Sequence, residues 1–394
     1  MHHVTDDERR ARIAARHALA PAFKVGTAEA ATRALTVLHA TEAASVYLSC
    51  WARVDGFEVA DLDRALYEDR SLVKQLAMRR TLFVFPRELL PAAWASASAR
   101  VAAAERTRIA KGIVKVGIAA DGDLWLKQAR AEILALLAEN PDGCTASEVR
   151  KAVPMIDVKV ELSAGQTFTA SGVLTLLGVE GELVRGLNTG RWTTSRPRWL
   201  LMNRWLGAEM ETLPSSSEGY RELVRRWLFS FGPGTEDDLV WWLGSTKGVV
   251  RTALAELHAV EVELDDGSTG WLLPDDLEEA ADPGPWVALL PAMDPTVMGW
   301  KRRDFYLGPH RDQLFDRNGN AGTTAWADGR IVGCWVQDAD GVVEVRKLEK
   351  ISARTSKALD AEASRLTKWL DGLRIGTGYL SAAMKAVPGS ADPG

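Results

Sequence analysis

The sequence is poor in the residues that build disulfides and metal sites. Its 394 residues include only three cysteines, which lie far apart and form no CxxC pair. His2, His3, His17, His258 and His310 lack the spacing of zinc ligands. These absences argue against a disulfide scaffold and a zinc site, and they favour a reducing, cytoplasmic compartment. We therefore expect neither a metal nor a cofactor.

The sequence also lacks long apolar runs and several familiar catalytic motifs. No stretch approaches the roughly 18 apolar residues that favour a membrane-spanning helix. The opening MHHVTDDERRAR is charged and has no apolar segment of the signal-peptide type. The run Gly376-Thr377-Gly378 carries no phosphate-loop lysine, and no GxSxG motif occurs. We expect a protein that is not secreted, does not span a membrane and does not bind nucleotides through a phosphate loop.

A net positive charge is missing as well. The formal net charge is −5, with 48 basic and 53 acidic residues, whereas a DNA-binding protein usually carries a basic domain or stripe. The basic residues are nevertheless grouped, and each group alone is typical of a solvated helix face. A nucleic-acid site would require several groups to meet on one surface. The groups are 9–16, 100–111, 191–204 and 301–303.

A coarse pattern of helices followed by a strand or hairpin recurs three times along the chain. This order is typical of winged-helix domains, whose last helix enters the major groove and whose hairpin forms the wing. We predict an α+β protein with three tandem winged helices, then a small antiparallel β-barrel and a C-terminal helix. The predicted bounds are 1–24 for an N-terminal basic helix, 25–122, 123–214 and 215–283 for the winged helices, 284–350 for the barrel and 351–394 for the last helix and tail.

The first repeat predicts mainly helices. Apolar residues at helical spacing indicate a helix over 42–53, and shorter stripes indicate helices around 62–66 and 73–77. The β-rich run 81–85 ends at a proline and predicts a strand. An Ala-rich helix over 91–111 should follow.

The second repeat contains a helix start and a wing. Thr145-Ala146-Ser147-Glu148 has the spacing of a capping box. The runs 182–185 and 191–194 flank turn residues and predict a hairpin whose tip carries Arg185 and Arg191.

The third repeat and the last region are richer in strands. The runs 260–264 and 271–273 flank Asp265-Asp266-Gly267, whose Asp-Gly pair favours a tight turn. Strand-like runs over 323–327, 330–337 and 342–348 predict the barrel, and a helix over 355–372 should follow it.

Four segments resemble one known family in their order along the chain. They are Val37-Leu38-His39-Ala40-Thr41 continuing to Arg53, Arg79-Arg80-Thr81-Leu82-Phe83-Val84, Leu289-Leu290-Pro291 with Asp294 and Met298 to Arg303, and Asp328-Gly329-Arg330 with Gly333 and Trp335. Together they resemble the AlkZ/YcaQ-type winged-helix DNA glycosylases. The resemblance implies winged helices and a barrel around a channel for double-stranded DNA. It also implies release of bulky N-alkylpurines, including interstrand crosslinks. We expect a monomer.

The catalytic motif of that family is altered in this sequence. The family has Gln-x-Gln or Gln-x-Asp where this chain has His39 and Thr41. Residues two apart share a face when the backbone is extended, so both could orient one water at the sugar. A neutral histidine could also act as a base, and Glu42 could supply the lost negative charge. The simpler alternative makes Thr41 the N-cap of the next helix and His39 an ordinary loop histidine.

Seven cations are candidates for DNA contacts. Arg79 and Arg80 precede a strand, and the basic group 301–303 follows the third family-like segment. Two further readings stay open: a winged-helix DNA-binding protein without catalysis, and a scaffold for protein interactions. The candidates are Arg79, Arg80, Arg185, Arg191, Lys301, Arg302 and Arg303.

Overall fold

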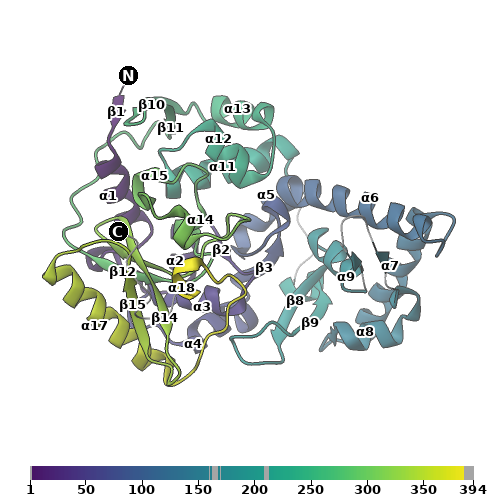
Figure 1. The fold of residues 1–394 in the computed structure, drawn as a ribbon. Coiled ribbons are helices and arrows are strands. Elements are labelled where there is room, and N and C mark those ends of the chain that lie inside the picture. The colour runs from purple at the N-terminus through teal and green to yellow at the C-terminus, as the bar shows by residue number, and fades with distance from the viewer. Residues whose placement is uncertain (1, 159, 162–166, 169, 208–212, 386–394) are drawn as a thin grey trace.

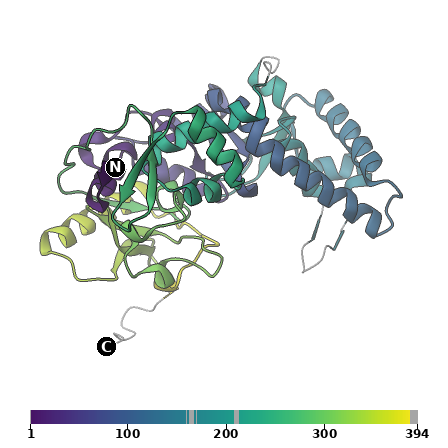
Figure 2. The ribbon, with the colours of Figure 1, turned by 90° about the horizontal axis from the view of Figure 1, so that it is seen from above.

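The computed structural model divides into a large lobe and a smaller arm (Figures 1 and 2). It describes residues 2–158, 160–161, 167–168, 170–207 and 213–385. One apolar core extends through the large lobe from Ile13 to Ala383, and a second core fills the arm between Ala102 and Trp199. None of the described helices combines the length and the apolar character that crossing a membrane requires.

The predicted catalytic segment belongs to a small antiparallel sheet in the large lobe. Its strand order is β2-β4-β3, with β2 (Leu38–His39), β4 (Leu82–Pro86) and β3 (Leu72–Leu76). The helix predicted over 42–53 is confirmed as α3 (Ala43–Trp51). Preceding and following helices are α2 (Ala28–Ala34) and α4 (Val59–Asp63).

One local prediction in this repeat is wrong. The helix expected around 73–77 is strand β3, because its residues pair in register with β4. Met78–Arg80 forms the tight turn that joins the two strands. Helix α2 ends at Ala34, and the chain is extended at 38–39. Short apolar runs fit the periodicity of a helix as well as that of a strand, and here the pairing with β4 selects the strand.

The predicted Ala-rich helix is confirmed as a helical path that links the lobe to the arm. It consists of α5 (Leu90–Ala93), a π-helical turn at 94–98 and α6 (Ala99–Lys115). Figure 1 shows α6 extending from the large lobe over the arm.

The arm contains the second predicted repeat. The capping box at Thr145 is confirmed, since Thr145 Oγ1 accepts from the Glu148 N–H and Glu148 accepts from the Thr145 N–H. The second hairpin strand lies at 197–201, and its prediction at 191–194 is wrong. The Asn188 side chain donates to Gly190, Arg191 and Thr194 carbonyls, which holds 189–196 as a loop. The arm's elements are α7 (Gly122–Glu139), β5 (Cys144–Thr145), α8 (Ala146–Ala152), β6 (Val160–Glu161), β7 (Thr167–Phe168), α9 (Ala170–Val179), β8 (Leu183–Asn188), β9 (Pro197–Leu201) and α10 (Met202–Leu206).

The third repeat has the predicted hairpin of β10 (Val260–Leu264) and β11 (Thr269–Leu272). A strand from the start of the chain, β1 (His2–Val4), pairs in parallel with β10 and completes a three-stranded sheet. The N-terminal helix is α1 (Asp6–Arg16). The helices of the repeat are α11 (Ser216–Phe231), α12 (Glu236–Leu243) and α13 (Lys247–Glu256).

The last region is a four-stranded antiparallel meander, and its predicted closure into a barrel is wrong for the described residues. The strand order is β12-β13-β14-β15, with no pairing between the first and last strands. Instead α17 (Ala353–Leu370), the predicted C-terminal helix, packs against both outer strands. The strands are β12 (Val287–Leu290), β13 (Thr324–Ala327), β14 (Arg330–Gln337) and β15 (Val343–Lys347). Short helices here are α14 (Pro295–Met298), α15 (Asp304–Leu307), α16 (Arg311–Leu314) and α18 (Ala382–Lys385).

Candidate catalytic and DNA-binding site

The backbone of the predicted catalytic segment is extended through β2 and then turns into α3. Leu38 and His39 pair with Val84 and Phe83 of β4, and the Ala40 N–H donates to the Leu82 carbonyl at 2.9 Å. The predicted loop is therefore a sheet edge followed by a bend. Because β4 fixes this backbone, the position of the His39 side chain is set by the sheet.

The imidazole of His39 is buried and weakly basic. The side chain is 3% exposed, and its ring packs edge-on against Phe83 with centroids 5.5 Å apart. Burial, with a smaller contribution from the cationic Arg79, lowers the pKa of His39 to about 3. Nδ1 is buried and has no hydrogen-bond partner among the described residues. The ring is therefore neutral at neutral pH, with unused hydrogen-bonding capacity.

Thr41 and Glu42 have other surroundings. Thr41 is exposed, and the N-cap of α3 is Glu42 rather than Thr41, so the predicted capping role of Thr41 is wrong. The Glu42 carboxylate accepts hydrogen bonds from Thr377 Oγ1, at 2.8 and 2.7 Å, and from the Gly378 N–H at 2.6 Å. Glu42 is thus bound to a segment near the C-terminal end of the described chain.

Two predicted DNA-binding arginines meet at one aromatic ring. The guanidinium carbons of Arg79 and Arg303 lie 3.8 and 5.0 Å from the ring centroid of Trp241. Burial, reinforced by Arg303, lowers the pKa of Arg79 to about 10, and burial also lowers the pKa of Arg303. Within the described chain neither arginine has a carboxylate within 4.0 Å, and Arg79 Nε is buried without a partner. The pair has no ion-pair partner among the described residues, the charge of Asp238 acts on Arg303, and Arg79 lies close enough to His39 to lower its pKa.

The other cations predicted near this pair are already neutralised. Arg80 points elsewhere and forms a bidentate pair with Glu105, at 2.8 and 3.2 Å. Lys301 Nζ lies 3.7 Å from Asp237, and Arg302 lies 3.4 Å from Asp266. Of the basic group 301–303, only Arg303 turns inward to Trp241.

The two predicted wing arginines lie on the arm in different settings. Arg185, in β8, lies over the Trp199 ring at 4.9 Å, and burial lowers its pKa to about 10. Arg191 is exposed in the loop between β8 and β9. Its neighbour Trp192 packs against Tyr47 of α3, with ring centroids 5.1 Å apart, so the loop between β8 and β9 contacts the large lobe close to the predicted catalytic segment.

A buried ion pair anchors α3 to the segment after β12. Arg53 and Asp294 are both fully buried, and the guanidinium donates to Asp294 at 2.7 and 2.9 Å. Ser49 Oγ also donates to Asp294 at 2.6 Å. Despite the burial, Arg53 and these hydrogen bonds hold the pKa of Asp294 below its usual value. Both residues belong to family-like segments, but nothing in the sequence indicates that they meet.

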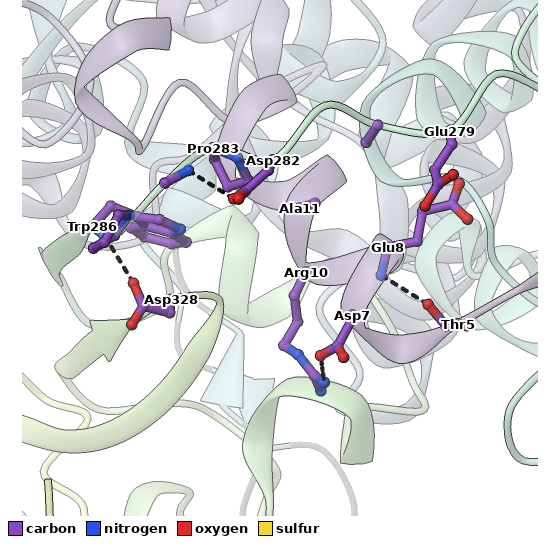
Figure 3. Close-up of a pocket in the computed structure, with 13 residues that line it drawn as sticks. Thr5, Asp7, Glu8, Arg10, Ala11, Glu279, Asp282, Pro283, Trp286 and Asp328 are labelled. Atoms are coloured by element: carbon purple, nitrogen blue, oxygen red, sulfur yellow. Dashed lines mark hydrogen bonds and ion pairs between the residues drawn. The ribbon is translucent and has the colours of Figure 1, made fainter.

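The pocket drawn in Figure 3 does not suit a polyanion. It lies between α1 and residues 279–286, with a volume of about 510 Å³. Its lining includes the carboxylates of Asp7, Glu8, Glu279, Asp282 and Asp328, against one cation, Arg10. Such a lining repels phosphate, so the DNA-binding candidate is the Arg79–Arg303 pair.

Sequence reasoning missed Trp241, the ring on which the two arginines meet. Trp241 lies in α12, and its only sequence signal is its place in an amphipathic helix rich in tryptophan. A search of the described residues for metal sites finds no cluster of three or more histidine, cysteine or acidic side chains.

Comparisons with known proteins show the family and the fold. Residues 32–369 match the family described as DNA glycosylase AlkZ-like. A protein of Streptomyces sahachiroi named interstrand DNA cross-link repair glycosylase is 26% identical over 204 residues, which are 50% of this chain and 54% of that protein. The aligned region thus spans about half the length of this relative. The solved structure of Streptomyces sahachiroi DNA glycosylase AlkZ superposes with a TM-score of 0.73 at 19% identity, covering 93% of this chain and 98% of that one.

Proposed function

Because the chain belongs to the AlkZ-like family of DNA glycosylases, we propose that it binds damaged duplex DNA and hydrolyses the N-glycosidic bond of bulky N-alkylpurines, including interstrand crosslinks. The name of the Streptomyces relative supports this choice of lesion. One observation carries the proposal: the neutral ring of His39 lies near Arg79, which meets Arg303 at the ring of Trp241. We infer that a hydrogen-bonding group and a cationic pair able to hold a phosphate occur together.

The reaction makes modest demands on the protein. Alkylation at N7 or N3 gives the purine a positive charge, so the base leaves with the electrons of the glycosidic bond and needs little acid catalysis. The sugar passes through an oxocarbenium-like state, and a water must be held at its C1′ atom. The water oxygen then bonds to C1′, and its proton passes to solvent.

His39 suits the orientation of that water better than the removal of its proton. A pKa of about 3 leaves the ring neutral at neutral pH, but it also makes the ring too weak a base to hold the water proton. With Nδ1 enclosed, the ring would meet the water through Nε2. The exposed Thr41 hydroxyl supplies a second contact.

Arg79 and Arg303 would hold a DNA phosphate. Two buried guanidiniums without a carboxylate partner lack the anion that usually accompanies them, and a phosphate matches their fork geometry. A bound phosphate would also cancel the positive field that otherwise opposes an oxocarbenium ion nearby. Since a crosslinked base cannot swing into a closed pocket, the reaction would take place in a groove.

The test is release of base from defined duplexes. Wild-type protein is incubated with N7-methylguanine DNA and with an alkyl-crosslinked duplex, and abasic sites are revealed by alkaline cleavage. We expect His39→Asn to slow release roughly 100-fold, and the exposed-site control His258→Asn to have no effect. Absence of abasic product from every lesion, with folded wild-type protein, would falsify the proposal.

A second function is favoured by the altered motif. Neither His39 nor Thr41 matches the Gln-x-Gln or Gln-x-Asp pair of the family, and His39 is only 3% exposed. A non-catalytic DNA-binding protein would show salt-dependent binding that survives His39→Asn, since phosphate contacts dominate such binding. It would release no base.

A further inference from the structure

Two cations lie where the arm meets the large lobe. Lys74 belongs to β3 of the lobe, and Arg185 belongs to β8 of the arm. The two strands are members of different sheets, yet they contact each other at the boundary, with α9 beside them (Figure 1). The side chains of this boundary therefore come from parts of the chain about 110 residues apart.

Lys74 and Arg185 line one small cavity between these two sheets. Its volume is about 10 Å³, close to the space that a single water molecule needs. Side chains two apart in a strand share a face, so Leu76 joins Lys74 in the lining and Leu183 joins Arg185. The cavity is completed by Leu82, Thr175, Gly178 and Trp199.

Neither cation meets an acid in this cavity. The Lys74 ammonium donates to Tyr67 Oη at 2.8 Å, and the guanidinium carbon of Arg185 lies 4.9 Å from the ring centroid of Trp199. Asp63 acts on Lys74 through its charge, but no carboxylate of the described ranges lies within ion-pair distance of either cation. Their direct partners are therefore a phenol and an aromatic ring.

The acids closest to Arg185 in sequence are engaged elsewhere. Glu180 contacts Arg106, and Glu182 lies 2.7 Å from Arg130. Both pairs involve helices α6 and α7 rather than the cavity. The arm therefore supplies a cation to its boundary with the lobe while its neighbouring carboxylates are already neutralised.

Both cations remain charged at neutral pH. Burial, with a smaller contribution from Arg185, lowers the pKa of Lys74 to about 8, and burial lowers the pKa of Arg185 to about 10. Two positive charges thus share a confined space. Such an arrangement costs free energy unless an anion compensates it.

We propose that the cavity between Lys74 and Arg185 binds a monatomic anion of the halide class, such as chloride, which neutralises both cations. The ammonium and the guanidinium N–H groups would donate to the ion. A space suited to one water molecule favours a halide over a DNA phosphate, because a phosphate carries four oxygens around its phosphorus. The inference gives Arg185 a ligand other than DNA and does not depend on the glycosylase reaction.

The ion would act on the junction between lobe and arm. Without it, the like charges of β3 and β8 repel each other across the boundary. With it, each strand contacts the same anion, and the repulsion becomes attraction. Since a ligand that binds only the folded state stabilises that state, halide should raise the melting temperature of the free protein.

The first experiment locates the ion directly. Crystals of the full chain are soaked in sodium bromide, and the bromide is identified by its anomalous scattering. We expect a peak between the Lys74 ammonium and the Arg185 guanidinium, and we expect its loss in Lys74→Met. Absence of a peak in wild-type crystals would overturn the inference.

The second experiment measures the effect in solution, without DNA. Melting temperatures are compared in sodium chloride and in sodium gluconate at one ionic strength, because gluconate is too large for the cavity. We expect wild-type protein to melt about 2–4 °C higher in chloride. Lys74→Met and Arg185→Met should each reduce this difference to less than about 1 °C. The matched control Lys111→Met, at an exposed lysine of α6 outside the cavity, should preserve it.

The gluconate measurements separate this role from a purely structural one. There Lys74→Met should melt no lower than wild-type protein, because the variant removes a cation that lacks its anion. A lysine that served only as a donor to Tyr67 would instead cost stability equally in both salts, and that result would count against the ion.

Three other outcomes would overturn the inference. An equal chloride effect in wild-type protein and all three variants would indicate a general effect of salt. A bromide peak without any chloride effect in solution would indicate an adventitious ion only. If chloride has no effect on wild-type protein but Lys74→Met and Arg185→Met weaken duplex binding in fluorescence anisotropy, the two cations hold a DNA phosphate instead.

Discussion

Two arginine sites lie close enough to His39 to influence its charge, and they are built in opposite ways. At the first, Arg53 is fully buried and meets a fully buried carboxylate, Asp294, in a bidentate pair. At the second, Arg79 and Arg303 both contact the ring of Trp241, with no carboxylate within ion-pair distance among the described residues. Both sites join segments far apart in sequence, yet only one satisfies its charge internally.

The difference separates a structural arginine from a binding arginine. Burying a charge is costly, and a fold usually repays the cost with a partner of opposite sign. Where the partner is missing, the protein is less stable than it could be, and the missing anion is expected from outside. This contrast makes the Arg79–Arg303 pair the stronger candidate for contacting DNA, although the Trp241 ring that both arginines contact is only partly exposed.

The largest effect should come from breaking the paired site. Arg53→Met leaves Asp294 buried without its cation, and we expect a loss of about 3–5 kcal/mol in unfolding free energy. Urea denaturation followed by circular dichroism measures it. The control Arg251→Met breaks an exposed bidentate pair with Glu236 and should cost far less, because solvent screens exposed ion pairs. Equal costs for the two variants would remove the distinction on which the comparison depends.

Substitutions at the Arg79–Arg303 site should instead weaken DNA binding without lowering the unfolding free energy. In Arg79→Met combined with Arg303→Met, DNA affinity should fall roughly 10- to 100-fold, and the slope of log affinity against log salt should decrease by up to about 2. Unfolding free energy should stay level or rise, because an uncompensated charge is removed. Fluorescence anisotropy with a labelled duplex measures the affinity. Arg80→Met, which removes a cation already paired with Glu105, is the control. Unchanged DNA binding in the double variant would contradict the assignment.

Lowering the pH should reveal the contribution of His39 to the stability of the fold. The folded pKa of His39 is about 3, against about 6.5 in the unfolded chain, so its contribution to stability is present above pH 6.5 and is lost as the pH falls toward 3. Each histidine of this kind costs about 1.4 kcal/mol per pH unit in that window. His39→Gln should therefore reduce the slope of unfolding free energy against pH by the contribution of one proton. Urea titrations at several pH values can measure this change. His17, whose pKa burial also lowers to about 3, keeps its own contribution. An unaltered slope in His39→Gln would show that the ring is protonated in the fold.

The smallest effect is expected at the exposed cations beside the unpaired site. Lys301 and Arg302 already contact Asp237 and Asp266, so a double alanine variant should lower DNA affinity no more than about threefold. The same anisotropy titration detects this change. A loss as large as that of the Arg79 and Arg303 variant would mean that exposed charge, rather than buried charge, dominates binding.

The sequence predicted the elements whose signals are local. The capping box at Thr145 and the Asp-Gly hairpin after Leu264 are confirmed because a few adjacent residues determine them. The strand at 72–76 was predicted as a helix because only its partner β4 decides the conformation. Among the described residues the expected barrel does not close, and α17 contacts both outer strands, a feature that no strand pattern contains. The division into three winged helices stays a prediction.

Individual residues of the candidate site could be predicted from the sequence, but which of them lie together in the fold could not. His39, Arg79 and Arg303 were all named from the sequence, and they lie near one another. Nothing in a linear pattern could separate Arg303, which turns inward, from its neighbours, which contact acids. The same holds for Glu42, whose bond to Gly378 joins residues 336 positions apart.

The pairing of β1 with β10 means that β1 cannot complete its sheet until β10 has been synthesised. His2 is in register with Val262, and the Asp6 N–H donates to Asp265, so the first strand has no sheet to join until the tenth has left the ribosome. At about 5–20 residues per second, the intervening segment takes roughly 13–50 s to emerge. During that time Arg12 of helix α1 remains without the hydrogen bonds that it later donates to the Asp276 carboxylate and the Glu278 carbonyl. Helix α1 therefore completes its packing only after β10 and residues 276–278 have been made.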